Sequence, residues 1–74
     1  MKILMTLTQD GSDVIQARHT AETMGERNTV AREWCMTSKK SICFWNPMRV
    51  DGQLRRELYA NGYRVIAVCS KEGV

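Results

Sequence analysis

The segment YRVIAVC, residues 63–69, is the feature that most limits what this chain can fold into. Four consecutive apolar residues, from Val65 to Val68, leave neither side of an extended segment polar. A strand that is apolar on both sides is typical of the centre of a covered sheet, and often of a parallel one. We therefore expect residues 63–69 to form the central strand of an α/β sheet.

Two other segments have the composition of strands. Residues 2–8 are rich in β-branched and apolar types, and residues 41–45, SICFW, form a shorter run of the same kind. Between them, apolar or small residues recur at near-helical spacing over residues 12–37. We expect that helix to be kinked or broken near residues 25–28, because Gly25 costs a helix about 1 kcal/mol relative to alanine.

A second helix, over residues 51–61, is predicted from its two ends and its apolar spacing. A capping residue stands at its start, leucines four residues apart share one face, and an Asn-Gly pair follows its last turn. Strand, helix and strand then form a βαβ unit with a helical crossover. The residues that carry the signals of the helix are Asp51, Leu54, Leu58, Asn61 and Gly62.

These elements predict one small α/β domain over residues 1–74. The expected chain order is βαβαβ, with a three-stranded, mostly parallel sheet and residues 63–69 at its centre. A chain of 74 residues buries only roughly 60% of its unfolded surface, so the core is small. The outer strands would leave backbone groups unpaired. We therefore expect that an edge strand can pair with another chain, including a second copy in a homodimer.

The stretch CFWNPMR, residues 43–49, places five residues between a cysteine and an arginine. Over these seven residues it resembles the loop of the cysteine phosphatases, which implies a Cys43 thiolate nucleophile and an Arg49 that binds phosphate. Such a loop wraps backbone N–H groups around one phosphate, whereas here bulky residues intervene and Pro47 has no N–H. We favour a strand that ends in an Asn-Pro turn at Asn46. Its two faces would be Ser41, Cys43 and Trp45 on one side, and Ile42 and Phe44 on the other.

Few other residues suggest catalysis or metal binding. His19 is the only histidine, and Glu22 is the one neighbour expected to orient it. Cys35, Cys43 and Cys69 do not match the spacing of a zinc site. We predict no catalytic residue, metal or cofactor. The odd cysteine count, the absence of a signal-peptide pattern and the lack of a membrane span favour a cytoplasmic protein with reduced thiols.

The basic residues gather in the second half of the chain. Residues 39–74 hold seven Lys or Arg and three Asp or Glu, which gives this half a net charge of +4. The whole chain carries +3. Lys39 and Lys40 form a candidate basic patch at the start of this half. An exposed aromatic residue, Trp45 or Tyr59, beside arginines is typical of a binding hot spot. The candidate interaction surface comprises Trp45, Arg49, Gln53, Arg55, Arg56, Tyr59 and Arg64.

These features favour a non-enzymatic binding module. The expected partner is another protein, such as a host protein contacted by a small accessory protein of a phage or mobile element. The alternative is a weakly specific nucleic-acid binder that uses the basic half of the chain, with no membrane involved. The third candidate is a cysteine-dependent phosphatase-like enzyme.

Overall fold

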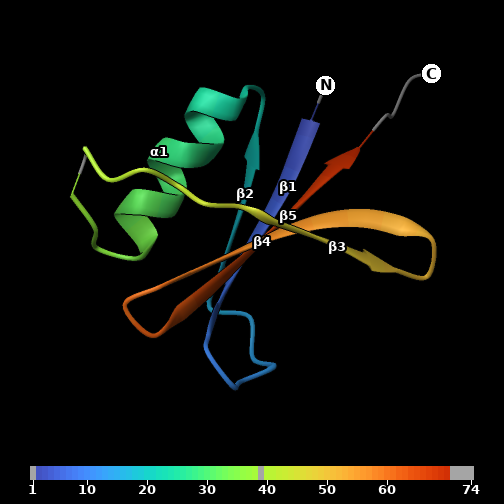
Figure 1. The fold of residues 1–74 in the computed structure, drawn as a ribbon, viewed down its shortest axis with the longest axis horizontal. Helices are drawn as coiled ribbons and strands as arrows, with labels where there is room; N and C mark the ends of the chain where they lie inside the picture. The colour runs from blue at the N-terminus through green and yellow to red at the C-terminus, as the bar shows by residue number, and fades with distance from the viewer. Residues whose placement is uncertain (1, 39, 71–74) are drawn as a thin grey trace.

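The structure, a computed structural model, describes residues 2–38 and 40–70. In these ranges it contains a five-stranded antiparallel sheet with one helix packed on one face (Figure 1). No helix within the described ranges is long and apolar enough to cross a bilayer. The strand order across the sheet is β2-β1-β5-β4-β3. The elements are β1 (Lys2–Gln9), β2 (Ala17–Ala21), α1 (Met24–Trp34), β3 (Asn46–Val50), β4 (Gln53–Ala60) and β5 (Tyr63–Ser70).

The predicted parallel βαβαβ architecture is wrong, although its central strand is present. β5 lies in the middle of the sheet and pairs with β1 along its whole length, from Lys2–Ser70 to Gln9–Tyr63. Both of its neighbours, β1 and β4, run antiparallel to it. Antiparallel neighbours can be joined by tight turns, so no crossover helix is needed between β4 and β5.

The predicted helix over 51–61 is also wrong, because its supposed cap and stop are two hairpin turns. Asp51 and Gly52 have φ angles of 52° and 78°, and Asn61 and Gly62 have φ angles of 50° and 79°. Positive φ at both central residues defines the type I′ turn, whose twist matches that of paired strands. Asp-Gly and Asn-Gly are the pairs that tolerate this conformation best. The residues between the two turns are therefore strand β4.

The predicted helix over 12–37 is divided into a strand and a shorter helix. β2 pairs antiparallel with β1, and its last residue, Ala21, is fully buried. α1 starts only after Thr23, whose Oγ1 accepts a hydrogen bond of 3.0 Å from the backbone N–H of Glu26. Gly25 lies in the first turn of α1, so the break predicted there is absent.

The expected strand over 41–45 and the turn after it are displaced along the chain. Residues 41–45 lie outside regular strand structure, and Asn46 and Pro47 open β3 instead of forming a turn. β3 lies at the edge of the sheet. A proline is tolerated at such an edge, because its missing N–H removes no bond from a central ladder.

The core fills the space between α1 and one face of the sheet. Ile3, Met5, Val65 and Cys35 are its largest fully buried side chains. Successive side chains of a strand point to opposite faces, so the residues that alternate with these face away from α1. We call that side the open face. It carries Leu4, Thr6, Arg55, Tyr59, Arg64, Ile66 and Val68.

Candidate functional site

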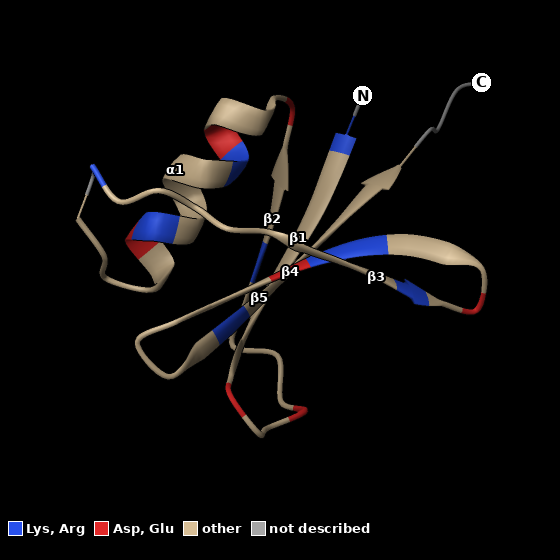
Figure 2. Cartoon of the chain, viewed as in Figure 1, with Lys and Arg blue, Asp and Glu red and all other residues tan. Residues whose placement is uncertain are grey.

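The structure separates the interaction surface predicted from the sequence. Arg55 and Arg56 were expected to share a short helix, but in strand β4 consecutive side chains point to opposite faces. Lys40 is exposed in the loop between α1 and β3, and Lys39 lies outside the described residues. Figure 2 shows the basic residues spread over the helix, the strands and this loop. Gln53, Arg55, Tyr59 and Arg64 lie on the open face, and Trp45, Arg49 and Arg56 on the helix side.

On the open face, Arg64 and Tyr59 are already engaged with Glu57. The Arg64 guanidinium forms an ion pair with the Glu57 carboxylate, with Nη2 2.9 Å from Oε2. The hydroxyl of Tyr59 donates to the same oxygen at 3.1 Å. The hydrogen bond to Glu57 is the main reason why the pKa of Arg64 is raised. This cluster is neutralised within the protein, which makes it a weak attractor for an anionic partner.

The segment CFWNPMR does not form a phosphate-binding loop. Cys43 Sγ donates to the backbone carbonyl of Asn28, 3.8 Å away, on the helix side. Arg49 donates from Nη1 to the carbonyl of Gly52 at 3.5 Å, beside the β3–β4 turn. Residues 46–50 between them are an extended strand, so the backbone does not curve around a common point.

His19 contacts a different carboxylate from the expected one. Its Nε2 lies 2.6 Å from Oε2 of Glu26, whereas Glu22 contributes only its backbone N–H to Glu26. The bond to His19 is the first cause of the lowered pKa of Glu26, ahead of the bond from Glu22. The pair connects β2 to the first turn of α1. Among residues 2–38 and 40–70, no group of three or more His, Cys, Asp or Glu is arranged to hold a metal ion.

Residues 41–45 are fixed to α1 through every second residue. Arg32 Nε donates to the carbonyl of Ser41 at 2.7 Å, and Trp45 Nε1 donates to Asn28 Oδ1 at 2.8 Å. Cys43, between them, donates to the backbone of Asn28 as described above. The side chains of Cys43 and Trp45 therefore share the side that faces the helix, as their alternation predicted, whereas Ser41 is held through its backbone carbonyl and the segment is not a paired strand.

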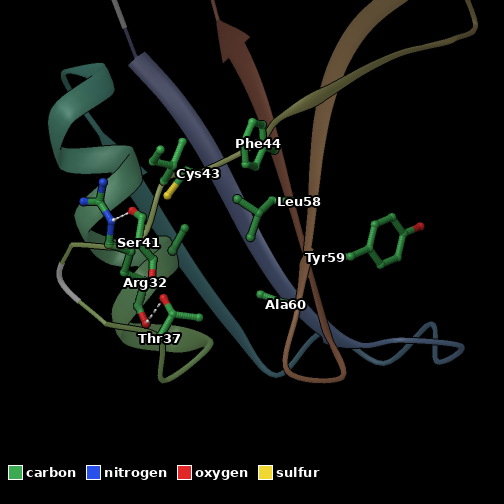
Figure 3. Close-up of a pocket in the computed structure, with 10 residues that line it drawn as sticks. Arg32, Thr37, Ser41, Cys43, Phe44, Leu58, Tyr59 and Ala60 are labelled. Carbon is green, nitrogen blue, oxygen red and sulfur yellow. Dashed lines mark hydrogen bonds between the residues drawn. The ribbon is translucent and has the colours of Figure 1, made fainter.

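The residues between these anchors point into solvent. Ile42 is 76% exposed and Phe44 is 74% exposed, and we call them the exposed pair. Behind them lies a small cavity of about 90 Å³ between α1, the loop and β4. Figure 3 shows the Arg32–Ser41 hydrogen bond and the Leu58 side chain directed towards this cavity, whereas Tyr59 points away from it.

A second concave feature lies where β4 and β5 separate. The two strands pair from Ala60–Tyr63 as far as Arg56–Ala67 and no further. Residues 53–55 then continue beside β3, while residues 68–70 continue beside β1. Figure 1 shows the start of β4 running outward with β3, away from the end of β5. The opening contains a cleft of about 580 Å³, which we call the β4–β5 cleft.

The β4–β5 cleft is lined by a buried arginine. Arg27 is only 8% exposed, and its Cζ lies 4.5 Å from the ring centroid of Trp45. Its Nε and Nη2 both donate to Asn28 Oδ1, at 3.2 and 3.1 Å. Burial is the first cause of its lowered pKa, and the positive charge of Arg56 is the second. Arg56 lines the same cleft, so two like charges meet there.

No protein-family model matches this chain, and comparisons with curated proteins and with solved structures give no significant match. What the protein can bind must therefore be inferred from its own surfaces.

Four residues important to these surfaces were missed in the sequence: Arg27, Asn28, Ile42 and Phe44. The expected exposed aromatic residue was Trp45 or Tyr59, and Tyr59 is indeed 48% exposed, but Phe44 is more so. One usable signal was present. The spacing Thr23-x-x-Glu26 is that of a capping box, which would have placed the helix start at Thr23 instead of near residue 12.

Proposed function

We propose that this protein is a non-enzymatic binding module that contacts another protein through the exposed pair, Ile42 and Phe44. The observation that supports this most directly is that both side chains are about three-quarters exposed, whereas the segment carrying them is fixed to α1. Burying a side chain of either type stabilises by roughly 1.5–3 kcal/mol. A segment already held in one conformation loses less entropy on binding, so more of this free energy contributes to affinity.

The proposal is tested by tagged pull-down from a bacterial lysate, with the wild type beside Ile42→Ser and Phe44→Ser. Val14→Ser is the matched control, because Val14 is 70% exposed on the distant β1–β2 connection. We expect one protein partner that survives nuclease and is captured by the wild type and Val14→Ser but is lost with both other variants. Equal capture by all four proteins would contradict the proposal.

Nucleic-acid binding remains the alternative, and the nuclease arm of this experiment separates the two. Binding through several phosphates would disappear with nuclease and weaken steeply with salt. The division of the arginines between two faces favours the protein partner, because a nucleic-acid strand needs its cationic contacts along one continuous path.

The proposal includes a cytoplasmic location and the role of a small accessory protein of the phage or mobile-element type. The location is supported by the thiols of Cys35 and Cys43, which are not joined to other cysteines. The accessory role remains a prediction based on the size of the chain.

A further inference from the structure

We propose that the β4–β5 cleft binds a carboxylate side chain of an extended segment of a partner protein, with Arg27 and Arg56 as its ligands. This inference rests on the proposed function, because it assumes that the partner is a protein. It adds the chemical group that the partner presents and a second contact site, separate from the exposed pair, where that group binds.

The first observation is a buried charge without a counter-charge. The ion pairs within the described residues are His19–Glu26 and Arg64–Glu57, and neither involves Arg27 or Arg56. A guanidinium remains charged even when burial lowers its pKa. Burying a charge is unfavourable unless an opposite charge accompanies it, and a second arginine nearby increases the penalty. An anion entering the cleft would relieve both effects.

The second observation is the arrangement of donors. Arg27 uses Nε and Nη2 on Asn28, and its guanidinium is stacked on Trp45, so its plane is fixed before any ligand arrives. Arg56 is half-exposed on β4, and no bond of its guanidinium to another described residue is present to compete with a ligand. The guanidinium of Arg27 is therefore fixed and that of Arg56 is available. Together they suit a carboxylate, which accepts paired N–H bonds.

The third observation is the character of the walls. Ile3, Leu54, Ala67 and Val68 line the cleft beside the two arginines. Beyond the Arg56–Ala67 pair, the facing edges of residues 53–55 and 68–70 are not paired with each other. An extended peptide can use such backbone edges while its apolar and acidic side chains meet alternate walls. A phosphate ion would gain no binding free energy from contact with these apolar walls.

A further arginine lies at the same opening on the other side of the sheet. Arg55 lines a hollow on the open face that shares Leu4, Gln53 and Val68 with the β4–β5 cleft. Its Nε is buried without a hydrogen-bond partner among the described residues. Asp13 also lines that hollow, so we assign the carboxylate to the helix side, where the described part of the lining contains no acidic residue.

The test uses the full chain and NMR of backbone amides and arginine Nε–H groups. The probes are a capped hexapeptide of alternating Glu and Val and its Gln-Val counterpart. We expect the Glu peptide to shift the signals of Arg27 and Arg56, and the Gln peptide to bind at least about tenfold more weakly. Arg56→Gln should weaken binding of the Glu peptide by a similar factor. Arg18→Gln, the same change at an exposed site on β2, should not.

Three outcomes would overturn the inference. Equal affinity for the two peptides would show that charge is not recognised. Stronger shifts with inorganic phosphate or an oligonucleotide would assign the cleft to phosphate. Finally, Glu72 lies outside the described residues, and a shift of the two arginine signals in Glu72→Gln without peptide would assign the cleft to the chain itself.

The outcomes are independent of the test of the exposed pair. Ile42→Ser and Phe44→Ser should still bind the Glu peptide. If the wild type binds this peptide but captures no protein through the exposed pair, the proposed function fails alone. If capture depends on Phe44 but the peptide does not bind, only the cleft inference fails.

Discussion

Asn28 is the residue that connects the two proposed binding features. Its side-chain oxygen accepts hydrogen bonds from both Arg27 and Trp45, and its backbone carbonyl accepts one from Cys43. One side chain thus orients the buried arginine of the cleft and also holds the segment that presents Phe44.

We expect Asn28→Ala to lower the free energy of unfolding by about 1–3 kcal/mol, because the buried Arg27 and the half-buried Trp45 lose their acceptor. Urea unfolding followed by tryptophan fluorescence measures this change. Thr29→Ala, at the next and exposed position of α1, should change it by less than about 0.5 kcal/mol. Equal stability of the two variants would mean that Asn28 does not hold the segment.

Protonation of Glu26 should lower the free energy of unfolding in acid. Its pKa in the folded state lies below the ordinary value of 4.5, chiefly because of the bond to His19. The unfolded chain therefore takes up the proton first, and the stability from Glu26 is lost as pH falls from 4.5 through the lower folded pKa.

The measurement is the urea midpoint from neutral pH down to about pH 3. Glu26→Gln should lose less stability over this window than the wild type. Glu33→Gln, at an exposed position of the same helix, should behave like the wild type. A wild-type slope in Glu26→Gln would rule out this contribution.

At the scale of the elements, two glycines should respond oppositely to the same substitution. Gly62 has a φ of +79° in the β4–β5 turn, and an added Cβ would meet nothing within 4 Å, so only the backbone opposes alanine there. Gly25 lies in α1, and its Cβ would come no closer than 3.9 Å to Thr23 Oγ1.

We expect Gly62→Ala to destabilise by about 1–2 kcal/mol and Gly25→Ala to stabilise by about 0.4–1 kcal/mol. Chemical denaturation of both variants beside the wild type measures the difference. If Gly62→Ala were neutral, the β4–β5 turn would not be type I′.

The sequence supported the central strand and the strand over residues 2–8, which is β1, but not the other elements. In β4, leucines four residues apart suggested a helical stripe, yet Leu54 is 41% exposed and only Leu58 is buried. Pairing with β3 and β5 outweighs the helical propensity of a segment rich in Gln, Leu, Arg and Glu. The Asp-Gly and Asn-Gly pairs, ten residues apart, were the stronger hairpin signal.

The same competition between helical spacing and strand pairing explains why the helix predicted in the first half of the chain is wrong. Val14, the first apolar residue of the segment that was expected to be helical, is 70% exposed on the β1–β2 connection. Residues 17–21 alternate instead, with Ala17 and Ala21 towards the core. A strand of five residues gives too short an alternation to be separated from helical spacing without its partner.

For the whole molecule, Cys35 should report global unfolding. It is fully buried between α1 and the sheet, and burial raises the pKa of its thiol, which lowers the reactive thiolate fraction. Iodoacetamide should therefore modify Cys35 only when the core opens, and its rate should rise with urea along the unfolding curve.

Peptide mass spectrometry after timed alkylation gives the rate at each cysteine. Cys43, half-buried in the loop, is the internal reference and should react in the native state. Modification of Cys35 at the rate of Cys43 without urea would contradict the packing of the core.

Only part of the candidate site was predictable from the sequence. The inward and outward alternation of residues 41–45 was visible, because it depends on local backbone geometry alone. The meeting of Arg27 with Arg56 was not. It depends on α1 covering the sheet beside β4, and residues 29 positions apart come together only through tertiary packing.

The long pairing of β1 with β5 has a consequence for synthesis on the ribosome. Among the strands of the sheet, β1 is made first and its central partner β5 last, so the middle of the sheet cannot close until Ser70 has left the exit tunnel. Until then β1 can pair only with β2. Its other edge waits for β5, and the core side chains of Ile3 and Met5 are not yet covered by that strand. We therefore expect a ribosome stalled before β5 to expose an unpaired, partly apolar strand edge, which is the kind of surface that chaperones at the tunnel exit bind.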